Sequence, residues 1–131
     1  MKPTKIGSDN NLKICPRGNG YTYGDMIINS NNIIVDTTLM KNILNWNNSK
    51  GEITVQPGVT FAEIFKISLI NNWTLSSCPG GLDITIGGSI SNNVHGKDTW
   101  NKGNFGEQVL SLKLISAEGK LLEIKKGKND L

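Results

Sequence analysis

Two glycine-rich segments place the strongest limit on how this chain can fold. The first, "RGNGYTYGD", covers Arg17 to Asp25, and the second, "PGGLDITIGGSISNNVHGK", covers Pro79 to Lys97. Glycine suits positions where a turn needs a positive φ or where another group approaches the backbone closely. Neither segment has the composition of a helix or strand interior, so the rest of the chain must supply the scaffold that holds them.

The front of the chain predicts strands and one clear helix. Strand candidates cover 12–15, 32–36 and 52–58, the last of them stopped by Pro57 and Gly58. Thr60 and Glu63 then have the spacing of a capping box. Apolar residues follow at three- and four-residue spacing, which predicts a core helix that fades at 71–73 and carries Phe61, Ile64, Phe65 and Leu69.

The back of the chain predicts a loop and then a hairpin. Residues 74–97 are dominated by Gly, Ser and Asn, which predicts mostly loop with at most one helical turn. In the following segment Leu110, Leu112 and Leu114 alternate with polar residues, and "AEGK" at 117–120 is a turn candidate. Strand, helix and strand at the front with a hairpin at the back predict a mixed α+β fold.

Composition excludes several classes of protein. The 131 residues are 37% hydrophobic and 19% charged, which is typical of a soluble single domain. The net charge is only +3, and the cluster Lys125 to Lys128 suits a solvated tail better than a nucleic-acid or membrane patch. The few aromatic residues are not interleaved with basic ones, so no nucleic-acid partner is expected.

The N-terminal stretch, the length of the apolar runs and the cysteines indicate the cellular compartment. The N-terminal stretch has no apolar core of a secretory signal, and no apolar run approaches the roughly 20 residues of a transmembrane segment. Cys15 and Cys78 are far apart and lack metal-type spacing, which favours two reduced thiols in a cytoplasmic protein; one disulfide is the alternative. We therefore expect a cytoplasmic protein without a transmembrane segment.

The first glycine-rich segment has two interpretations. Alternate glycines after a strand let backbone N–H groups converge on one point, which makes a nest for an anion. Arg17 would add positive charge and Thr22 a hydroxyl donor, a set that suits a pyrophosphate better than a metal ion. The same residues also suit a surface turn, and the residues alone leave this choice open. The segment is not a Rossmann fingerprint, because no helix with a three-glycine spacing follows it.

The second segment leaves room beside its backbone. Gly80 and Gly81 follow Pro79 as a tight turn, and Gly87 and Gly88 open a run of small residues along which a flat or extended group could lie. His95, the sole histidine, comes next. A lone histidine is more often structural than functional, and both interpretations stay open on the residues alone. No second His and no Cys stands at ligand spacing, so no metal site is expected.

Taken together, the motifs resemble those of a known family. They are "RGNGYTYGD", "VDTTLMKNI", "VQPGVTFAEI" and "PGGLDITIGGSISNNVHGKDTWNKGNFGEQVLSLKLISAEGKL". In this order they resemble the FAD-binding domain of the vanillyl-alcohol oxidase and p-cresol methylhydroxylase (PCMH) superfamily. Within it they are most similar to the branch of decaprenylphosphoryl-ribose oxidases and of the related sugar and aldonolactone oxidases. The resemblance covers nearly the whole chain, from about Leu12 to its end.

The resemblance implies a PCMH-like α+β fold in which two small α+β subdomains sandwich the cofactor. Residues of about 12–75 would form the first, β-α-β subdomain, and about 76–131 would begin the second. Members of the family continue into a further part of the FAD domain and a substrate or cap domain. The chain therefore resembles a truncated FAD-binding domain, and any catalytic residues of a cap domain are unknown.

The resemblance also implies a set of cofactor-binding residues. The first loop would wrap the FAD pyrophosphate, with Tyr23 near the flavin, through Arg17, Gly18, Asn19, Gly20, Tyr21 and Thr22. The second would run along the cofactor through Gly80, Thr85, Ile86, Gly87, Gly88, Asn92, Asn93 and His95. His95 and Lys97 would lie on the flavin side, near the substrate, which makes them and Tyr23 candidates for roles at the flavin. The segment "GNFG", 103–106, would pack under the cofactor loop.

One departure from the family bears on how the cofactor is attached. Many relatives have a histidine directly after the "RGxG" turn, and its ring bonds covalently to the flavin. Here Tyr21 stands at that position, and a phenol does not replace the imidazole in that bond. The resemblance therefore implies non-covalent FAD.

Three functions follow as hypotheses. The first is the FAD-binding portion of a flavin-dependent oxidoreductase that oxidises a CH–OH group of a sugar-like or alcohol substrate, in which the cofactor carries the redox step. The second is a non-catalytic FAD or dinucleotide-binding module, or a fragment that needs a partner chain, either another copy or a missing C-terminal portion. The third is a structural or carbohydrate-binding domain whose glycines only make turns.

Overall fold

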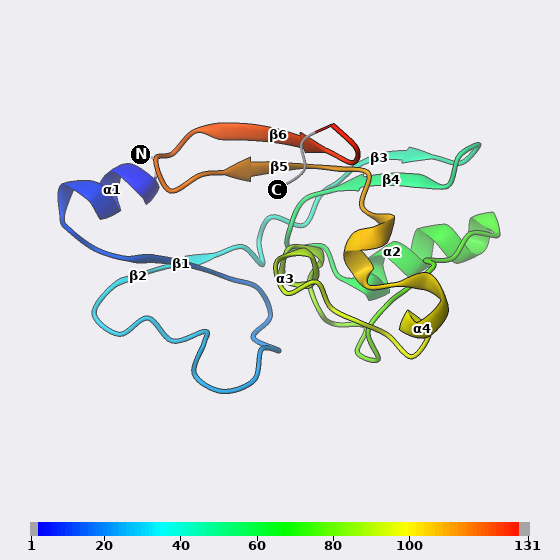
Figure 1. The fold of residues 1–131 in the computed structure, drawn as a ribbon, viewed down its shortest axis with the longest axis horizontal. Helices are drawn as coiled ribbons and strands as arrows, with labels where there is room; N and C mark the ends of the chain where they lie inside the picture. Colours follow the sequence, from blue (N-terminus) through cyan, green and yellow to red (C-terminus); the bar gives the residue numbers. More distant parts are fainter. Residues whose placement is uncertain (1–2, 129–131) are drawn as a thin grey trace.

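One short helix, two pairs of strands, a group of short helices and a third pair of strands follow one another along residues 3–128, the part of the chain that this computed structural model describes (Figure 1). The strands are β1 (Ile14–Arg17), β2 (Ile33–Asp36), β3 (Ile43–Asn47), β4 (Glu52–Val55), β5 (Ser111–Ile115) and β6 (Leu121–Lys125). The α-helices are α1 (Pro3–Asp9), α2 (Phe61–Ser68), α3 (Ile86–Ser91) and α4 (Thr99–Lys102). Two 3₁₀ turns, η1 (Leu69–Asn71) and η2 (Phe105–Gln108), complete the elements. The predicted mixed α+β fold is confirmed.

The strands form three separate two-stranded sheets within the described residues. β1 and β2 are parallel and in register from Ile14 opposite Ile33 to Arg17 opposite Asp36. β3–β4 and β5–β6 are antiparallel hairpins. Because the carboxyl ends of parallel strands meet at one edge, Arg17 and Asp36 end their strands side by side. That edge leads directly into the first glycine-rich segment.

The helix α2 begins where the sequence predicts it. The Thr60 N–H donates to Glu63 Oε2 at 2.8 Å, and the Glu63 N–H donates to Thr60 Oγ1 at 3.3 Å. These bonds satisfy two orphan donors of the first turn, as a capping box does. The helix ends at Ser68, and Asn72 takes a left-handed conformation with φ of 60° after η1. The predicted capping box and the fading of the helix at 71–73 are confirmed.

The core joins α2, α3 and η2. Phe61 on α2 meets Phe105 on η2 edge to face, with 5.2 Å between the ring centroids. Such aromatic pairs stabilise beyond their buried area. The buried hydrophobic residues that surround this pair belong to one cluster, made of Val59, Phe61, Ile64, Ile86 and Phe105.

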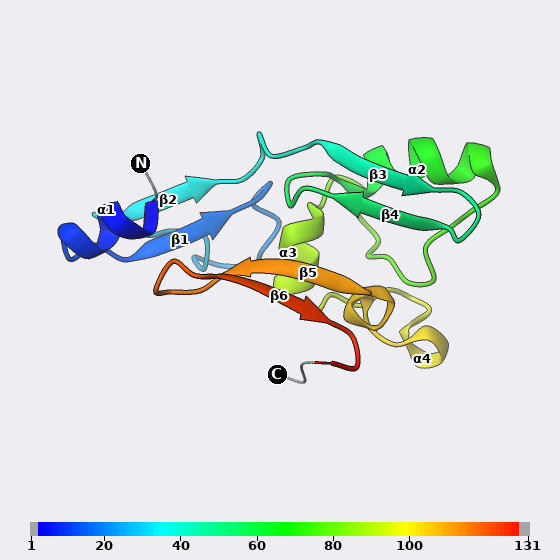
Figure 2. The same ribbon diagram turned by 90° about the horizontal axis from the view of Figure 1, so that it is seen from above.

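Backbone hydrogen bonds fasten the second glycine-rich segment to the start of α2. The Ile86 N–H donates to the Val59 carbonyl at 2.8 Å, and the Gly87 N–H donates to the Pro57 carbonyl at 2.8 Å. A Cβ atom at Gly87 would lie 2.7 Å from Pro57 Cβ, so this close approach admits only glycine. As a result α3 lies near the middle of the molecule in both views (Figures 1 and 2).

The structure contains elements that the sequence pattern does not predict: α1, β3 and α4. The strand β3 reads "ILNWN", with asparagines that weaken a strand signal. Its turn into β4 is held from outside, because Trp73 Nε1 donates to the Asn48 carbonyl at 2.9 Å. The Trp73 ring also covers Gly51, whose φ is +63°. A residue far along the chain therefore stabilises this hairpin, which local pattern cannot reveal.

The segment 74–97, predicted as mostly loop with at most one helical turn, contains the six-residue helix α3. The predicted hairpin at the back of the chain is present as β5–β6. Its turn at 116–120 includes Gly119 with φ of +76°, and the Thr4 side chain of α1 lies against it. The alternating leucines share one face of the hairpin, but Leu110, Leu114 and Leu122 remain exposed. Both cysteines are free thiols.

Candidate functional site

The first glycine-rich segment presents unused backbone donors. The N–H groups of residues 18–23 donate no hydrogen bond to any part of the described chain. Gly20 and Gly24 have φ of 78° and 72°, conformations that glycine adopts without strain. These donors lie in a partly exposed loop directly after a strand, so they are available to an anion.

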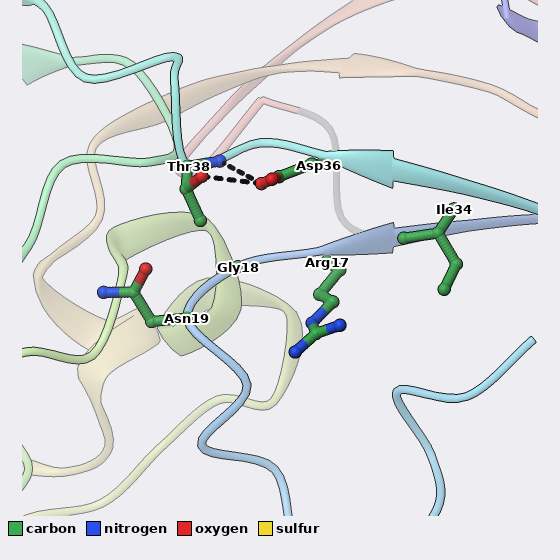
Figure 3. A pocket seen from close by; sticks show the side chains of 6 residues that line it. All are labelled: Arg17, Gly18, Asn19, Ile34, Asp36 and Thr38. Carbon is green, nitrogen blue, oxygen red and sulfur yellow. Dashed lines mark hydrogen bonds between the residues drawn. The ribbon is translucent and has the colours of Figure 1, made fainter.

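A hollow of about 380 Å³ lies at the carboxyl ends of β1 and β2. Figure 3 shows Arg17 and Asp36 on the adjoining strands, with Gly18 and Asn19 where the chain leaves β1. Within residues 3–128 the Arg17 guanidinium makes no hydrogen bond or salt bridge, so its charge is available to a ligand. The hollow is lined by Arg17, Gly18, Asn19, Ile34, Asp36 and Thr38.

Asp36 shapes one side of this hollow and stays ionised. Its Oδ1 accepts the Thr38 hydroxyl at 2.7 Å and the Thr38 N–H at 2.9 Å. The hydroxyl bond is the main cause that holds the pKa of Asp36 below its ordinary value, and Arg17 adds a smaller effect. Sequence reasoning missed Ile34, Asp36 and Thr38 as lining residues. The signal that could have found them is an acidic residue at the end of a strand parallel to β1.

The two glycine-rich segments meet around the side chain of Thr85. Asn19 Nδ2 donates to the Asp83 carbonyl at 2.7 Å. A Cβ atom at Gly18 would overlap Thr85 Oγ1 and would lie 3.3 Å from Thr85 Cβ. A Cβ atom at Gly88 would lie 3.2 Å from the same hydroxyl and would meet nothing else within 4 Å. Both glycine backbones therefore border one hydroxyl group.

The Thr85 hydroxyl has no partner of its own. Thr85 is 2% exposed, precedes α3 and does not cap it with its side chain. Neither this hydroxyl nor the Gly88 N–H is used in a hydrogen bond within residues 3–128. Within residues 3–128 the fully enclosed side-chain atoms without a partner are Trp46 Nε1 and Ser68 Oγ, so the Thr85 hydroxyl keeps contact with solvent and is open to a ligand or an ordered water.

Other predicted residues of the second segment serve the scaffold. Ile86 is in the core, and Gly87 packs on Pro57. The Asn92 amide donates to the Gly88 carbonyl at 2.9 Å, while Asn93 Oδ1 accepts the Gly106 N–H at 3.0 Å. The Phe105 N–H also donates to the Val94 carbonyl at 2.8 Å, so the "GNFG" segment does pack against the end of the second segment.

The remaining predicted residues are exposed. Tyr21 is 55% and Tyr23 95% exposed, and Gly80 has open space around its Cα. His95 and Lys97 are exposed and have no hydrogen-bond or salt-bridge partner within residues 3–128. The His95 side chain is therefore not part of the core. Thr22, which stands between Tyr21 and Tyr23 in the first glycine-rich segment, is partly buried.

Two features are absent from residues 3–128. No group of three or more His, Cys, Asp and Glu side chains gathers there as metal ligands would. Among the helices in that range, none has both the length and the apolar character needed to cross a membrane.

Comparisons with known proteins show the family of the chain. Residues 4–125 match the family model described as an FAD binding domain. Decaprenylphosphoryl-beta-D-ribose oxidase of Mycolicibacterium smegmatis is 27% identical over 118 residues, 90% of this chain and 26% of that protein. L-gulonolactone oxidase of Mus musculus is 24% identical over 137 residues, 98% of this chain and 31% of that protein. The chain thus spans between a quarter and a third of these relatives.

Solved structures share the fold. 6-Hydroxy-D-nicotine oxidase from Arthrobacter nicotinovorans superposes with a TM-score of 0.82 at 17% identity, over 96% of this chain and 27% of that one. Alkyldihydroxyacetonephosphate synthase does so with a TM-score of 0.78 at 20% identity, over 96% of this chain and 26% of that one. The resemblance to the vanillyl-alcohol oxidase and p-cresol methylhydroxylase superfamily is confirmed. The chain belongs to the FAD binding domain family.

Proposed function

We propose that this chain binds FAD non-covalently through its two glycine-rich segments. The observation that carries the proposal is the unpartnered Thr85 hydroxyl between the backbones of Gly18 and Gly88. The free N–H groups of 18–23 and the unpaired Arg17 cation suit a diphosphate, because both are donors to anionic oxygen. The residues present therefore fit the cofactor of the family.

The proposed roles follow from these contacts. Arg17, Gly18, Asn19, Gly20, Tyr21 and Thr22 hold the diphosphate, and the open side of Gly88 lets the cofactor approach the α3 backbone. Gly80, Thr85, Ile86, Gly87, Asn92 and Asn93 form or support the second wall. His95 and Lys97, both exposed, would supply polar contacts at the flavin edge, with Tyr23 as a further candidate near the flavin. Tyr21 offers no imidazole at the position of covalent attachment, which supports non-covalent FAD.

We further propose that the parent protein is an oxidoreductase that acts on a CH–OH group of a sugar-like substrate. Two relatives bear the names of oxidases of this kind, for decaprenylphosphoryl-ribose and for gulonolactone. Bound FAD would supply the hydride acceptor for such a reaction. This chain would bind and orient the cofactor through the first α+β subdomain, at about 12–75, and the start of the second, at about 76–131.

A partner-dependent role is the alternative. It is favoured by the exposed leucine face of the β5–β6 hairpin, since an exposed apolar sheet face is typical of a surface that another chain or segment covers. In that case the chain would bind FAD weakly alone and tightly with the partner. Turnover of an aldose-type or alcohol substrate by the full-length protein would separate an enzyme from a module without activity.

The experiment that tests the proposal is FAD retention. The purified chain is mixed with FAD and passed through a gel-filtration column, and the flavin spectrum and stoichiometry are measured. We expect near-stoichiometric yellow protein whose flavin is released by acid, together with a thermal shift that grows with FAD concentration. Flavin that stays attached after acid treatment would contradict non-covalent binding. A full-length protein that retains no FAD would contradict the proposed function itself.

A further inference from the structure

We propose that Gln108 is a positioning residue that holds the turn of His95, Gly96 and Lys97 in place at the cofactor edge. The inference rests on the proposed FAD site, because the purpose of the turn is defined by that site. Gln108 is the last residue of η2 and lies 13 residues after His95 in the sequence. Gln108 acts on the turn through Ser76 and Ser77, which lie just before the second glycine-rich segment.

The Gln108 amide clamps two consecutive residues of that segment. Its Oε1 accepts the Ser76 N–H at 3.0 Å and the Ser76 hydroxyl at 3.1 Å, and its Nε2 donates to the Ser77 carbonyl. Both ends of one side-chain amide are therefore used on backbone more than 30 residues away in sequence. The clamp is anchored to the core, because Phe105 of the same 3₁₀ turn is buried against Phe61.

The segment that Gln108 holds continues into Cys78, whose carbonyl group lies against Gly96. A Cβ atom at Gly96 would overlap the Cys78 carbonyl oxygen and would lie 2.6 Å from Asp98 Oδ1. Ser77, which is 1% exposed, donates its hydroxyl to the same Asp98 oxygen at 3.5 Å. The backbone of Gly96 is thus packed on the carbonyl of Cys78, the residue directly after the two that Gln108 holds, and only glycine permits this approach.

The far side of the turn is closed by Thr99. The Gly96 N–H donates to Thr99 Oγ1 at 3.0 Å, and this hydroxyl donates back to the Gly96 carbonyl at 2.9 Å. His95 and Lys97 flank Gly96, and their side chains have no partner within the described residues. The position of both side chains therefore depends on how firmly the Gly96 backbone is held.

The test uses the fact that His95 is the sole histidine, so its imidazole NMR signals are unambiguous. In Gln108→Ala we expect amide-exchange protection at Gly96 to fall about tenfold, from the loss of three hydrogen bonds. The amide of Ile64, in the buried face of α2, should keep its protection. A general loss of stability would lower both, so the difference between them reports the turn itself.

A matched control is Asn29→Ala. Asn29 Nδ2 clamps the Lys13 carbonyl at 3.1 Å and the Ile33 carbonyl at 2.9 Å, at the end of β1 and β2 remote from Arg17. This variant loses the same kind of contact elsewhere and should leave Gly96 protection within about twofold. If Gln108→Ala does not fold, Gln108→Glu keeps the acceptor for Ser76 but not the donor to Ser77. We then expect protection at Gly96 to fall about threefold.

The readout at the cofactor is the His95 ring signal upon addition of FAD. In the wild-type chain we expect FAD to shift it, and in Gln108→Ala we expect that shift to fall at least twofold while the FAD dissociation constant changes by less than about threefold. Unchanged protection at Gly96 in both Gln108 variants would overturn the inference. So would FAD binding that leaves the wild-type His95 signal in place. Absence of FAD binding would overturn the proposed function, whereas the exchange data would still decide the clamp.

Discussion

At the scale of single residues, the two glycine-rich segments meet at the hydroxyl of Thr85. It touches the backbone of Gly18 from the first glycine-rich segment and of Gly88 from the second. The two glycines differ in kind. Space at Gly18 is filled by the protein itself, whereas space at Gly88 is open apart from the Thr85 hydroxyl. A side chain at either position should therefore weaken FAD binding, for different reasons.

Gly88→Ala is expected to weaken FAD binding by at least about tenfold and to leave stability unchanged or raised by up to about 1 kcal/mol. The new methyl group would occupy the space for the cofactor, while alanine favours a helix over glycine. Fluorescence titration with FAD and thermal unfolding measure the two effects. Gly81→Ala is the control, since its Cβ would meet only Ile84 at 3.4 Å. If FAD binding survives even Gly88→Val unchanged, the proposed close approach is wrong.

Gly18→Ala is expected to destabilise the chain by about 1–3 kcal/mol, because its Cβ would overlap the buried Thr85 side chain. Adding Thr85→Ala removes the overlapping atoms and should restore most of the stability. FAD affinity should not return, since the hydroxyl donor is gone. Urea unfolding and FAD titration of both single variants and the double variant measure this cycle. Additive losses of stability would contradict the contact between the two segments.

Among the elements, the start of α2 holds the part of the second glycine-rich segment that leads into α3. The first residue of α2, Phe61, donates its N–H to the Ile84 carbonyl at 3.4 Å, and Thr60 forms an isolated bridge with Thr85. The capping box that starts the helix therefore also fixes the strand-like stretch that carries Thr85. Loss of the cap should therefore disturb the position of Thr85 as well as the start of the helix.

Thr60→Ala is expected to cost about 1 kcal/mol of stability. The box also makes stability depend on pH. A hydrogen bond from the Thr60 N–H is the main cause that holds the pKa of Glu63 below its ordinary value. This contribution is complete above the pKa of the unfolded carboxyl and is lost as pH falls through the lower folded pKa. Glu63→Gln keeps the cap without an ionisable carboxyl group. Its free energy of unfolding should therefore fall less between neutral and acidic pH than that of the wild-type chain. Equal pH dependence in both proteins would contradict the box.

For the whole molecule, a small core carries most of the stability. Five buried hydrophobic residues form it, and the Phe61–Phe105 pair joins α2 to η2 across it. Many large hydrophobic side chains lie outside this core, including those on the β5–β6 hairpin. Within residues 3–128 the fully buried hydrophobic side chains therefore gather around the residues that hold the second segment and not on the hairpin.

Phe61→Ala is expected to cost about 3–5 kcal/mol, a large part of the 5–15 kcal/mol typical of a domain. The cost has two sources, the lost burial of the ring and the cavity beside Phe105. Leu121→Ala is the comparison, because Leu121 is 64% exposed, and it should change stability by less than about 0.5 kcal/mol. Chemical denaturation measures both. A cost above 2 kcal/mol for Leu121→Ala would show that the hairpin is covered in solution.

Much of the fold is readable from local pattern. The capping box at Thr60, the strand before Arg17 and the hairpin around Gly119 each depend on residues close together in sequence, so their spacing is enough to predict them. Left-handed turns are likewise local, and asparagines adopt them at Asn11, Asn31, Asn72 and Asn93. Local pattern does not predict the strand β3, because Trp73, far along the chain, stabilises its turn.

By itself, the sequence determined the family and the segments whose backbone is bare, because glycine spacing and the order of motifs are local properties of the chain. Only the tertiary structure decided that Gly18 and Gly88 share the Thr85 hydroxyl, that Asp36 lies beside Arg17, and that Gln108 supports Gly96. These contacts join residues far apart in the chain. They arise from strand pairing and core packing, which place side chains in space in a way that no local pattern encodes.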